Sequence, residues 1–485
     1  MEMKTSMDAH TVSLSEADAF SIGRLDAHGQ AALAASGDVS TRELVEAAIL
    51  RIEKLDPILN AITFRDYDRA RQRSAMAEGP MAGVPWLIKE GLDYPGMPSR
   101  AGSRSRRDAG PGTIAFDYSK AFDAQGIVAL GKTSAPEFGL LPTTEPLLYG
   151  PTRNPWALDR SPGGSSGGAA AAVASGMVPL AHAADGGGSI RIPASCCGLV
   201  GMKPGRGGNL RARDQHIIDD LLACDTLLSR SVRDVAWATA IGAGRPQRVT
   251  GPDTRRLTIA VIAESLDGTA PSPEVADVLE RAAALCGALG HTVVVRTMPV
   301  DGAAVATAFR TIWGFLARDV AAATITRVGT DEAESLLEPW TLDLARWSAG
   351  ITLDDVDAMY RQVGAAAAAM AKFFEQHDVI LSPVLRHPAV RIGDLAPSCA
   401  FEALMPRMFD YVSYTPLHNL SGNPAISLPL FTPADGVPIG SMFAAARGQE
   451  DLLLALAYEL EAAAPWADRW PTHSIAGLAP SSGAS

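Results

Sequence analysis

Cysteine and positive charge are both scarce in this chain of 485 residues, and each shortage excludes a class of protein. Its 5 cysteines are odd in number and follow no spacing pattern, so we expect no disulfide framework and no metal site. This usage is typical of a reducing cytoplasm. Lys and Arg number 42 against 54 Asp and Glu, and the net charge of −12 argues against nucleic acid as a partner, because phosphate binding relies on clustered basic residues.

A long, uninterrupted apolar run is also lacking. Residues 161–184 carry no charge, but Gly, Ser and Pro interrupt them throughout, so we expect no membrane span there. The first 20 residues include acidic side chains and no apolar segment of the kind found in secretory signals. Since 47% of the residues are hydrophobic, which is ample for a core, we expect one domain at 21–475 between flexible tails at 1–20 and 476–485.

Glycine, in contrast, is concentrated where serine also occurs. One cluster is Gly-Gly-Ser-Ser-Gly-Gly at 163–168, and a second is Asp-Gly-Gly-Gly-Ser-Ile-Arg at 185–191. Three glycines before Ser189 indicate backbone N–H groups turned toward one point. Such a nest beside a hydroxyl suits acyl transfer, in which each donor to the developing oxyanion is worth roughly 3 to 4 kcal/mol. A pair of flexible Gly/Ser loops is the alternative explanation.

The segment between the two clusters predicts a helix at 168–174 and a buried strand at 178–183. This order can bring Ser189 back beside Ser165, although spacing alone does not prove it. The second cluster continues as Ile-Pro-Ala-Ser and then Gly-Met-Lys-Pro, which ends at Pro204. Two clusters followed by this tail favour a built site over flexible loops.

These residues resemble the signature of the amidase signature family, and the resemblance extends over residues 22–470. The family also has a lysine in a G-x-P-x-x-x-K segment, matched here by residues 83–89. The resemblance implies that Ser189 is the nucleophile, Lys89 the base and Ser165 a bridging serine with an unusual peptide bond to Gly164 or Ser166. It also implies an α/β fold, with one large domain built on a mixed, mostly parallel central sheet flanked by helices, and no cofactor.

Several neighbours complete the expected site. The nest predicts that the oxyanion binds the backbone N–H groups of residues 186–189, namely Gly186, Gly187, Gly188 and Ser189. Ser166, Asp185 and Arg191 are expected to support these groups, Asp185 by accepting hydrogen bonds from the loop and Arg191 by neutralising a carboxylate. Many family members have Thr or Ile where this chain has Gly186, so a looser loop is expected here.

Lys89 closes a predicted buried strand at 84–88. A salt bridge with Glu90 is the simpler explanation for this segment alone. As a base, however, the lysine must be neutral, and from an unperturbed pKa near 10.4 this costs roughly 4.6 kcal/mol at pH 7, so burial must lower its pKa. We therefore predict an alkaline activity optimum. Glu90 stands where the family usually has Asp, and we assign it no catalytic role.

Two other motifs point to different chemistry. Residues 126–133 fit the Walker A pattern, but a strand is predicted inside the supposed phosphate loop, so nucleotide binding is not expected. Residues 163–167 fit G-x-S-x-G, which would make Ser165 the nucleophile of an α/β-hydrolase. That fold needs a later acid and histidine. The available histidines, none in an informative context, are His377, His387, His418 and His473.

The rest of the chain is expected to surround this site. Residues 134–156 predict a long ordered loop near the active centre, whereas residues 205–225 show few strand signals. Long helices are predicted at 303–324 and 354–376. Their region includes large apolar side chains expected mostly in the core, with a minority lining a substrate channel, namely Trp313, Phe315, Leu316 and Trp340.

The sequence thus predicts a cofactor-free serine hydrolase of C–N acyl bonds, acting with water on small molecules, with homodimerisation left open. The branch of the family that it resembles implies apolar linear or cyclic amides such as nylon oligomers, and urethane and ester hydrolysis as further activities. One rival is the A subunit of a tRNA-dependent amidotransferase, which usually has Gln where this chain has Ile192. A catalytically silent binding protein is disfavoured because all three reacting positions are present.

Overall fold

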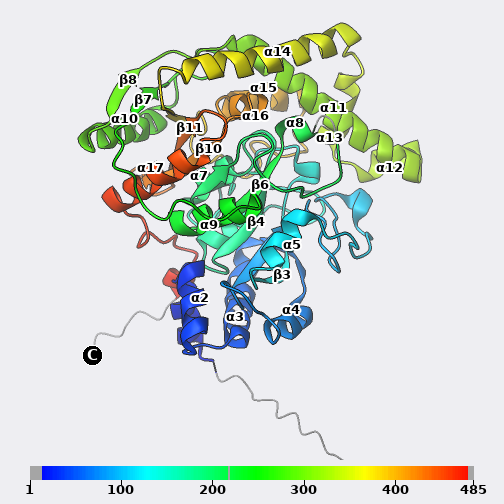
Figure 1. Cartoon of the computed structure of the whole chain (residues 1–485). Helices are drawn as coiled ribbons and strands as arrows, with labels where there is room; N and C mark the ends of the chain where they lie inside the picture. Colours follow the sequence, from blue (N-terminus) through cyan, green and yellow to red (C-terminus); the bar gives the residue numbers. More distant parts are fainter. Residues whose placement is uncertain (1–13, 217–218, 479–485) are drawn as a thin grey trace, which may run out of the picture.

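Residues 14–216 and 219–478 are described by the computed structural model and form one α/β domain around two mixed β-sheets (Figure 1). The five-stranded sheet has the order β1 (Ile62–Arg65), β3 (Val128–Thr133), β2 (Pro85–Lys89), β4 (Leu180–Asp185) and β6 (Cys224–Leu228). The six-stranded sheet has the order β5 (Gly201–Lys203), β10 (Ala425–Phe431), β11 (Ile439–Ala445), β9 (Val379–Pro383), β7 (Thr258–Val261) and β8 (Thr292–Val295).

The mixed sheets flanked by helices confirm the expected α/β fold, but there are two sheets instead of one central sheet, and each contains antiparallel as well as parallel pairs. In the five-stranded sheet, β2 is parallel to both β3 and β4, but the edge strands β1 and β6 are antiparallel to their neighbours. In the other sheet, β9, β7 and β8 are parallel, while β5, β10, β11 and β9 pair antiparallel. A short connection such as 432–438 between β10 and β11 permits only antiparallel pairing. An isolated bridge between Val200 and Ser229 links the two sheets.

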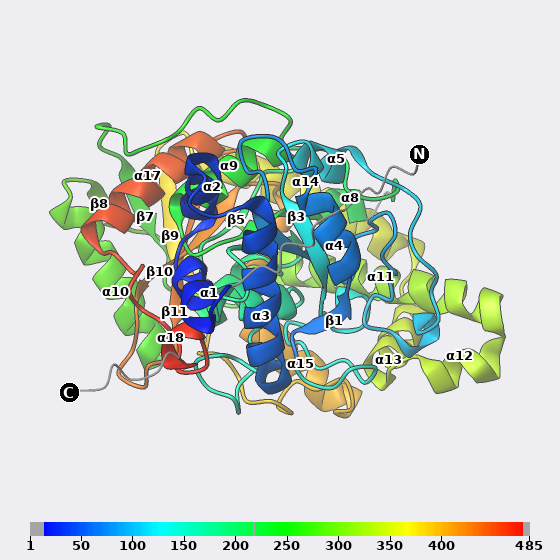
Figure 2. The ribbon, with the colours of Figure 1, turned by 90° about the horizontal axis from the view of Figure 1, so that it is seen from below.

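Helices cover both faces of the five-stranded sheet. One face packs against α3 (Thr41–Leu59), α6 (Gly167–Ala174) and α7 (Arg191–Cys197), and the other against α5 (Asp117–Asp123) and α9 (Val232–Gly242). Figure 2 shows α3 in front of the strands, with α4 (Tyr67–Ser74) and the N-terminal helices α1 (Glu16–Gly23) and α2 (Ala27–Ser36) beside it. Helix α6 is entirely buried, and its small alanine and glycine residues allow it to lie close to β4.

The six-stranded sheet also lies between helices. One face packs against α10 (Pro273–Ala288) and α17 (Glu450–Ala463). The other face meets a helical layer, seen at the top of Figure 1, that we call the helical wall: α11 (Gly302–Val328), α12 (Thr330–Leu336), α13 (Pro339–Ser348), α14 (Leu353–Phe373), α15 (Phe401–Tyr411) and α16 (Pro416–Leu420). The remaining short helices are η1 (Arg104–Arg106), η2 (Glu137–Gly139), α8 (Asp219–Leu222) and α18 (Ile475–Leu478).

The chain ends differ from the predicted boundaries. Helix α1 begins at Glu16, inside the segment expected as a tail, because Ser15 and Asp18 form a capping box and Phe20 is buried. At the other end α18 extends to Leu478, with Ile475 buried. The rest of the two predicted tails, residues 1–13 and 479–485, lies outside the described residues.

The uncharged stretch at 161–184 is divided between a loop, α6 and most of β4. Within residues 14–216 and 219–478, no helix combines the length and the apolar character needed to cross a bilayer. Because β2 and β4 are parallel neighbours, Lys89 and Asp185 stand at the same edge of the sheet. This carboxyl edge is where α/β proteins generally bind ligands.

Candidate active site

Lys89 and Ser165 are in direct contact. Strand β2 is buried along its whole length, and Lys89 at its end is 6% exposed. Its Nζ donates a hydrogen bond to Ser165 Oγ over 2.7 Å and another to the carbonyl of Ala184 over 3.2 Å. Both of these acceptors are uncharged oxygens. Neither of them is the Glu90 carboxylate, the salt-bridge partner considered from the sequence.

The turn that carries Ser165 is fixed from both sides. The Gly164–Ser165 peptide bond is cis, which places the unusual bond at one of the two positions expected. Ser166, which directly precedes α6, donates from its hydroxyl to Ala184 O over 3.4 Å and accepts from Ala184 N over 3.3 Å. The serine turn is therefore tied to the end of β4, the same strand that leads to the second glycine cluster.

Ser189 lies on the wall of a cavity of about 420 Å³ that Lys89 and Ser165 also line. This volume is within the range of small-molecule sites. Ser189 is 7% exposed and Ser165 is 3% exposed. Among the hydrogen bonds of the described residues, none joins the two serine hydroxyls. The cavity thus brings the three predicted residues together, and the Lys89–Ser165 contact is formed, but the expected Ser165–Ser189 contact is not.

The loop before Ser189 corrects the predicted set of oxyanion donors. The N–H of Gly188 donates to Asp185 Oδ1 over 2.7 Å, so it is already used. The backbone N–H groups of Gly186, Gly187 and Ser189 donate no hydrogen bond to any of the described residues. Gly188 has a φ of 135°, and a Cβ there would clash with Thr415 and Ile192. Its positive φ lets the loop close on Asp185, and its N–H is already bonded to that carboxylate.

Asp185 and Arg191 form a fully buried ion pair behind this loop. The two groups are joined by Nε to Oδ2 at 2.9 Å and by Nη2 to Oδ1 at 3.0 Å. Asp185 also accepts the N–H of Ile190 over 3.2 Å. Burial alone would raise the pKa of Asp185, but the Arg191 guanidinium holds it well below its usual value. These are the contacts expected of the two residues, and their catalytic relevance stays a prediction.

Helix α16 and the residue before it contribute two side chains that the sequence did not single out. Asn419 donates from Nδ2 to Asp185 Oδ1 over 2.9 Å and accepts at Oδ1 from Arg191 Nη2 over 2.6 Å. Thr415, which precedes the helix, donates to the carbonyl of Gly187 over 2.6 Å. Both residues are more than 220 positions away from their partners in sequence, so no local spacing signal could have identified them.

Neighbouring charged groups are turned to other partners. Glu90 accepts from Thr63 Oγ1 over 2.6 Å and Tyr149 OH over 3.1 Å; its burial raises the pKa of its carboxyl. Lys132 lies on β3, and its Nζ donates to the carbonyl of Leu92. Burial lowers the pKa of Lys132 to about 8. Since β3 spans residues 128–133, the strand predicted inside the Walker-like segment is confirmed.

The histidine alternative finds little support. None of the later histidines proposed as partners of Ser165 is among the described residues that line its cavity. His387 instead contacts Asp410 at 3.3 Å, and His418 is buried in α16, where desolvation lowers its pKa well below the usual value. The cavity wall does include His182, whose Nε2 lies 3.1 Å from Asp225 Oδ1 on β6. Neither residue was expected at the site.

The loop at 134–156 forms one side of the cavity, as the sequence predicts. Phe138 and Leu140 of this loop line the cavity, together with Trp313 of α11. The carbonyl of Leu140 accepts the indole N–H of Trp313 over 3.0 Å and that of Trp340 over 3.2 Å. Trp313 and Leu316 are thus the members of the apolar set that reach the cavity, whereas Trp340 and Phe315 are buried elsewhere.

Known proteins match this chain over nearly its whole length. A sequence profile of the family described as Amidase matches residues 43–454. The protein named "Putative amidase AmiC" from Mycobacterium tuberculosis is 39% identical over 460 residues, covering 92% of this chain and 96% of that protein. The 6-aminohexanoate-cyclic-dimer hydrolase of Paenarthrobacter ureafaciens is 34% identical over 490 residues, again with 92% and 96% covered.

Two solved structures compare the amide hydrolase with the amidotransferase alternative. The structure of 6-aminohexanoate cyclic dimer hydrolase complexed with substrate has a TM-score of 0.85 and 32% identity, covering 93% of this chain and 99% of that chain. The glutamyl-tRNA(Gln) amidotransferase component of the same fold from Thermotoga maritima has a TM-score of 0.74 and 25% identity, covering 94% and 98%. Similarity to the amidotransferase component is therefore weaker than similarity to the amide hydrolase.

Proposed function

This chain belongs to the amidase signature family of amide C–N hydrolases, and we propose that it acts through an acyl-enzyme on Ser189, assisted by Ser165 and Lys89. The observation that carries this proposal is the 2.7 Å contact between Lys89 Nζ and Ser165 Oγ in the wall of the cavity that Ser189 also lines. The bridging serine gives the lysine a route to the nucleophile.

In the first half of the reaction, Ser189 Oγ attacks the substrate carbonyl carbon. The Ser189 proton passes to Ser165 Oγ as the Ser165 proton passes to Lys89, and the carbonyl oxygen gains the negative charge. The N–H groups of Gly186, Gly187 and Ser189 support this step, because they lie beside the nucleophile without an acceptor among the described residues. The C–N bond then breaks, and Lys89 returns a proton through Ser165 to the leaving nitrogen.

In the second half, a water molecule attacks the acyl-enzyme. Its proton passes through Ser165 to Lys89, the bond from the acyl carbon to Ser189 Oγ breaks, and Ser189 regains a proton by the same route. This scheme requires the Ser165 and Ser189 hydroxyls to approach each other when substrate binds. Such catalytic hydrogen bonds commonly tighten only in the complex with substrate.

The substrates we propose are apolar amides, with carbamates and esters as further substrates. The apolar part of the cavity supports this choice, since Leu92, Phe138 and Trp313 are among its lining residues. The named activity of the cyclic-dimer hydrolase adds nylon oligomers as candidates. Free cysteines throughout the described residues are compatible with the cytoplasmic location that we also propose.

The test compares wild type with Ser189→Ala on an anilide, an aryl ester, a dicarbamate and a nylon oligomer. We expect wild type to cleave the anilide and Ser189→Ala to lose more than about 10⁴-fold in kcat, as nucleophile removal does in serine hydrolases. Ser195→Ala is the matched control, because Ser195 is buried in α7 and its Oγ accepts the N–H of Gly440 over 2.8 Å.

Two results would overturn the proposal. Activity of Ser189→Ala within tenfold of wild type would exclude Ser189 as the nucleophile, and the Ser165 alternative would then be tested with a serine-directed fluorophosphonate. Turnover that requires ATP and charged tRNA would instead restore the amidotransferase alternative. Mass spectrometry of wild type quenched during turnover should find the acyl group on Ser189.

A further inference from the structure

A second, smaller cavity adjoins the nucleophile. It has a volume of about 20 Å³, enough for one water molecule or a group of similar size. Ser189 and Gly187 lie on its wall, and the other side chains around it are apolar, including Leu140, Ile192, Phe309, Trp313, Met408 and Val412. We call this space the small cavity and the 420 Å³ space the large cavity.

The two cavities meet at Ser189 but differ in the other reacting groups that line them. Lys89 and Ser165 line the large cavity, whereas the residues around the small cavity include neither of them. Ser165 must give its proton to the leaving nitrogen, so the amine part of the substrate belongs in the large cavity. The carbonyl oxygen points to the N–H groups of the glycine loop. The small cavity is then left for the remaining substituent of the carbonyl carbon, the acyl chain.

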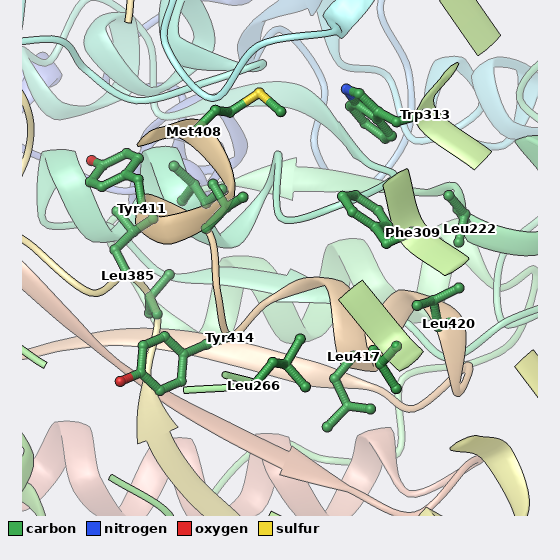
Figure 3. Close-up of a cluster of buried hydrophobic side chains, with 14 of the residues drawn as sticks. Leu222, Leu266, Phe309, Trp313, Leu385, Met408, Tyr411, Tyr414, Leu417 and Leu420 are labelled. Carbon is green, nitrogen blue, oxygen red and sulfur yellow. The ribbon is translucent and has the colours of Figure 1, made fainter. Parts of the chain in front are cut away.

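The wall of the small cavity is difficult to displace. Trp313 is held by its hydrogen bond to Leu140 O, and its ring centroid is 5.0 Å from that of Phe309. The Phe309 ring lies so close to the glycine loop that a Cβ on Gly187 would collide with it. Figure 3 shows Phe309 and Trp313 side by side, with Met408 extending toward them from α15. A longer acyl chain would have to move one of these side chains.

We infer that the small cavity is the acyl pocket of this enzyme, and that Phe309 and Met408 restrict it to short apolar acyl groups such as acetyl and propionyl. The substrate class is then short-chain N-acyl derivatives of larger amines, with the amine in the large cavity, which narrows the substrates proposed above and makes nylon oligomers, with their six-carbon acyl chain, poor ones. This inference rests on the proposed function, because it uses Ser165 to orient the leaving group. Phe309 and Met408 are specificity-determining residues in this scheme and take no part in proton transfer.

The experiment measures kcat/KM for the 4-nitroanilides and phenyl esters of acetic, butyric, hexanoic and octanoic acid. For wild type we expect acetyl to exceed hexanoyl by at least about 30-fold, since one methylene in an apolar pocket is worth about 10- to 200-fold. Phe309→Ala and Met408→Ala should each raise the ratio of hexanoyl to acetyl kcat/KM at least about tenfold. Phe401→Ala is the control, because Phe401 packs against Trp340 in the same layer and lines neither cavity.

The outcomes separate this inference from the proposed function. A wild type indifferent to acyl length, or Phe309 and Met408 variants with the wild-type profile, would overturn the acyl-pocket assignment and leave the serine mechanism intact. A wild type that cleaves none of the anilides or esters would overturn the proposed function itself. Phe309→Leu keeps an apolar side chain and replaces Phe309→Ala in the same comparison should the alanine variant not fold.

Discussion

The carboxyl edge of the five-stranded sheet and the helical wall opposite it are held together in different ways. At the sheet edge, Lys89, Asp185 and Arg191 are buried, and each is fixed by directional hydrogen bonds to named partners. In the wall, Phe309 and Met408 are buried equally well but are held by apolar packing. Hydrogen-bonded polar groups tolerate little change, whereas apolar packing adapts to volume-conserving substitutions. We therefore expect substitutions at the sheet edge to abolish the reaction, and substitutions in the helical wall to change the range of substrates.

The strongest test of this contrast uses two buried lysines on neighbouring strands. Lys89→Met keeps the side-chain length but removes the amine that contacts Ser165, and we expect kcat/KM to fall about 10²- to 10⁴-fold, the usual size of a general base effect. Lys132→Met is the control, because Lys132 is equally buried one strand away and bonds Leu92 O instead. It should retain activity within tenfold of wild type. Equal losses of activity in the two variants would show that removing either buried lysine destabilises the fold, and that Lys89 has no separate role as a base.

A second test addresses the ion pair that holds the glycine loop. Asp185→Asn preserves shape but leaves the Arg191 guanidinium buried without a counter-charge, which typically costs about 3 to 5 kcal/mol in the free energy of unfolding. Urea denaturation at pH 7 measures the change. Asp357→Asn, which breaks an exposed pair with Arg361 on α14, should cost less than about 0.5 kcal/mol. Similar costs for the two substitutions would mean that the buried pair is not a structural anchor.

The sequence could predict the sheet edge because its signals are local. The glycine clusters and the buried strand before Lys89 each depend on residues a few positions apart. Strand β6 was not predicted, because Asp225 within it is buried through contacts with His182 and Arg213 that lie outside the strand. The roles of Thr415 and Asn419 could not be predicted either, because both contact residues more than 220 positions away. The hydrogen bond from the Gly188 N–H to Asp185 likewise becomes apparent only in the folded loop.

A cluster of hydrogen bonds, which we call the polar joint, connects α13 of the helical wall to the loop at 134–156. The helical wall is therefore not held by apolar packing alone. Glu137 of η2 accepts the N–H of Glu338 over 2.9 Å and the hydroxyl of Thr341 over 2.6 Å, so it caps the start of α13. Glu338 is itself 1% exposed and accepts the N–H of Leu147 over 2.6 Å. Burial, together with the neighbouring Glu137 carboxylate, raises the pKa of Glu338 to about 8.

This joint predicts the smallest of the three effects, a stability that declines as pH rises. The folded protein holds a proton on Glu338 that the unfolded chain releases near its ordinary pKa of 4.5, so this group's contribution is complete below about pH 4.5 and is lost as pH rises through 8. Glu338→Gln stays neutral throughout. Relative to wild type, it should therefore gain on the order of 2 kcal/mol in unfolding free energy between pH 5 and pH 9. Urea denaturation at pH 5, 7 and 9 tests this, and parallel pH profiles for the two proteins would mean that the wall contains no titrating joint and is held by packing alone.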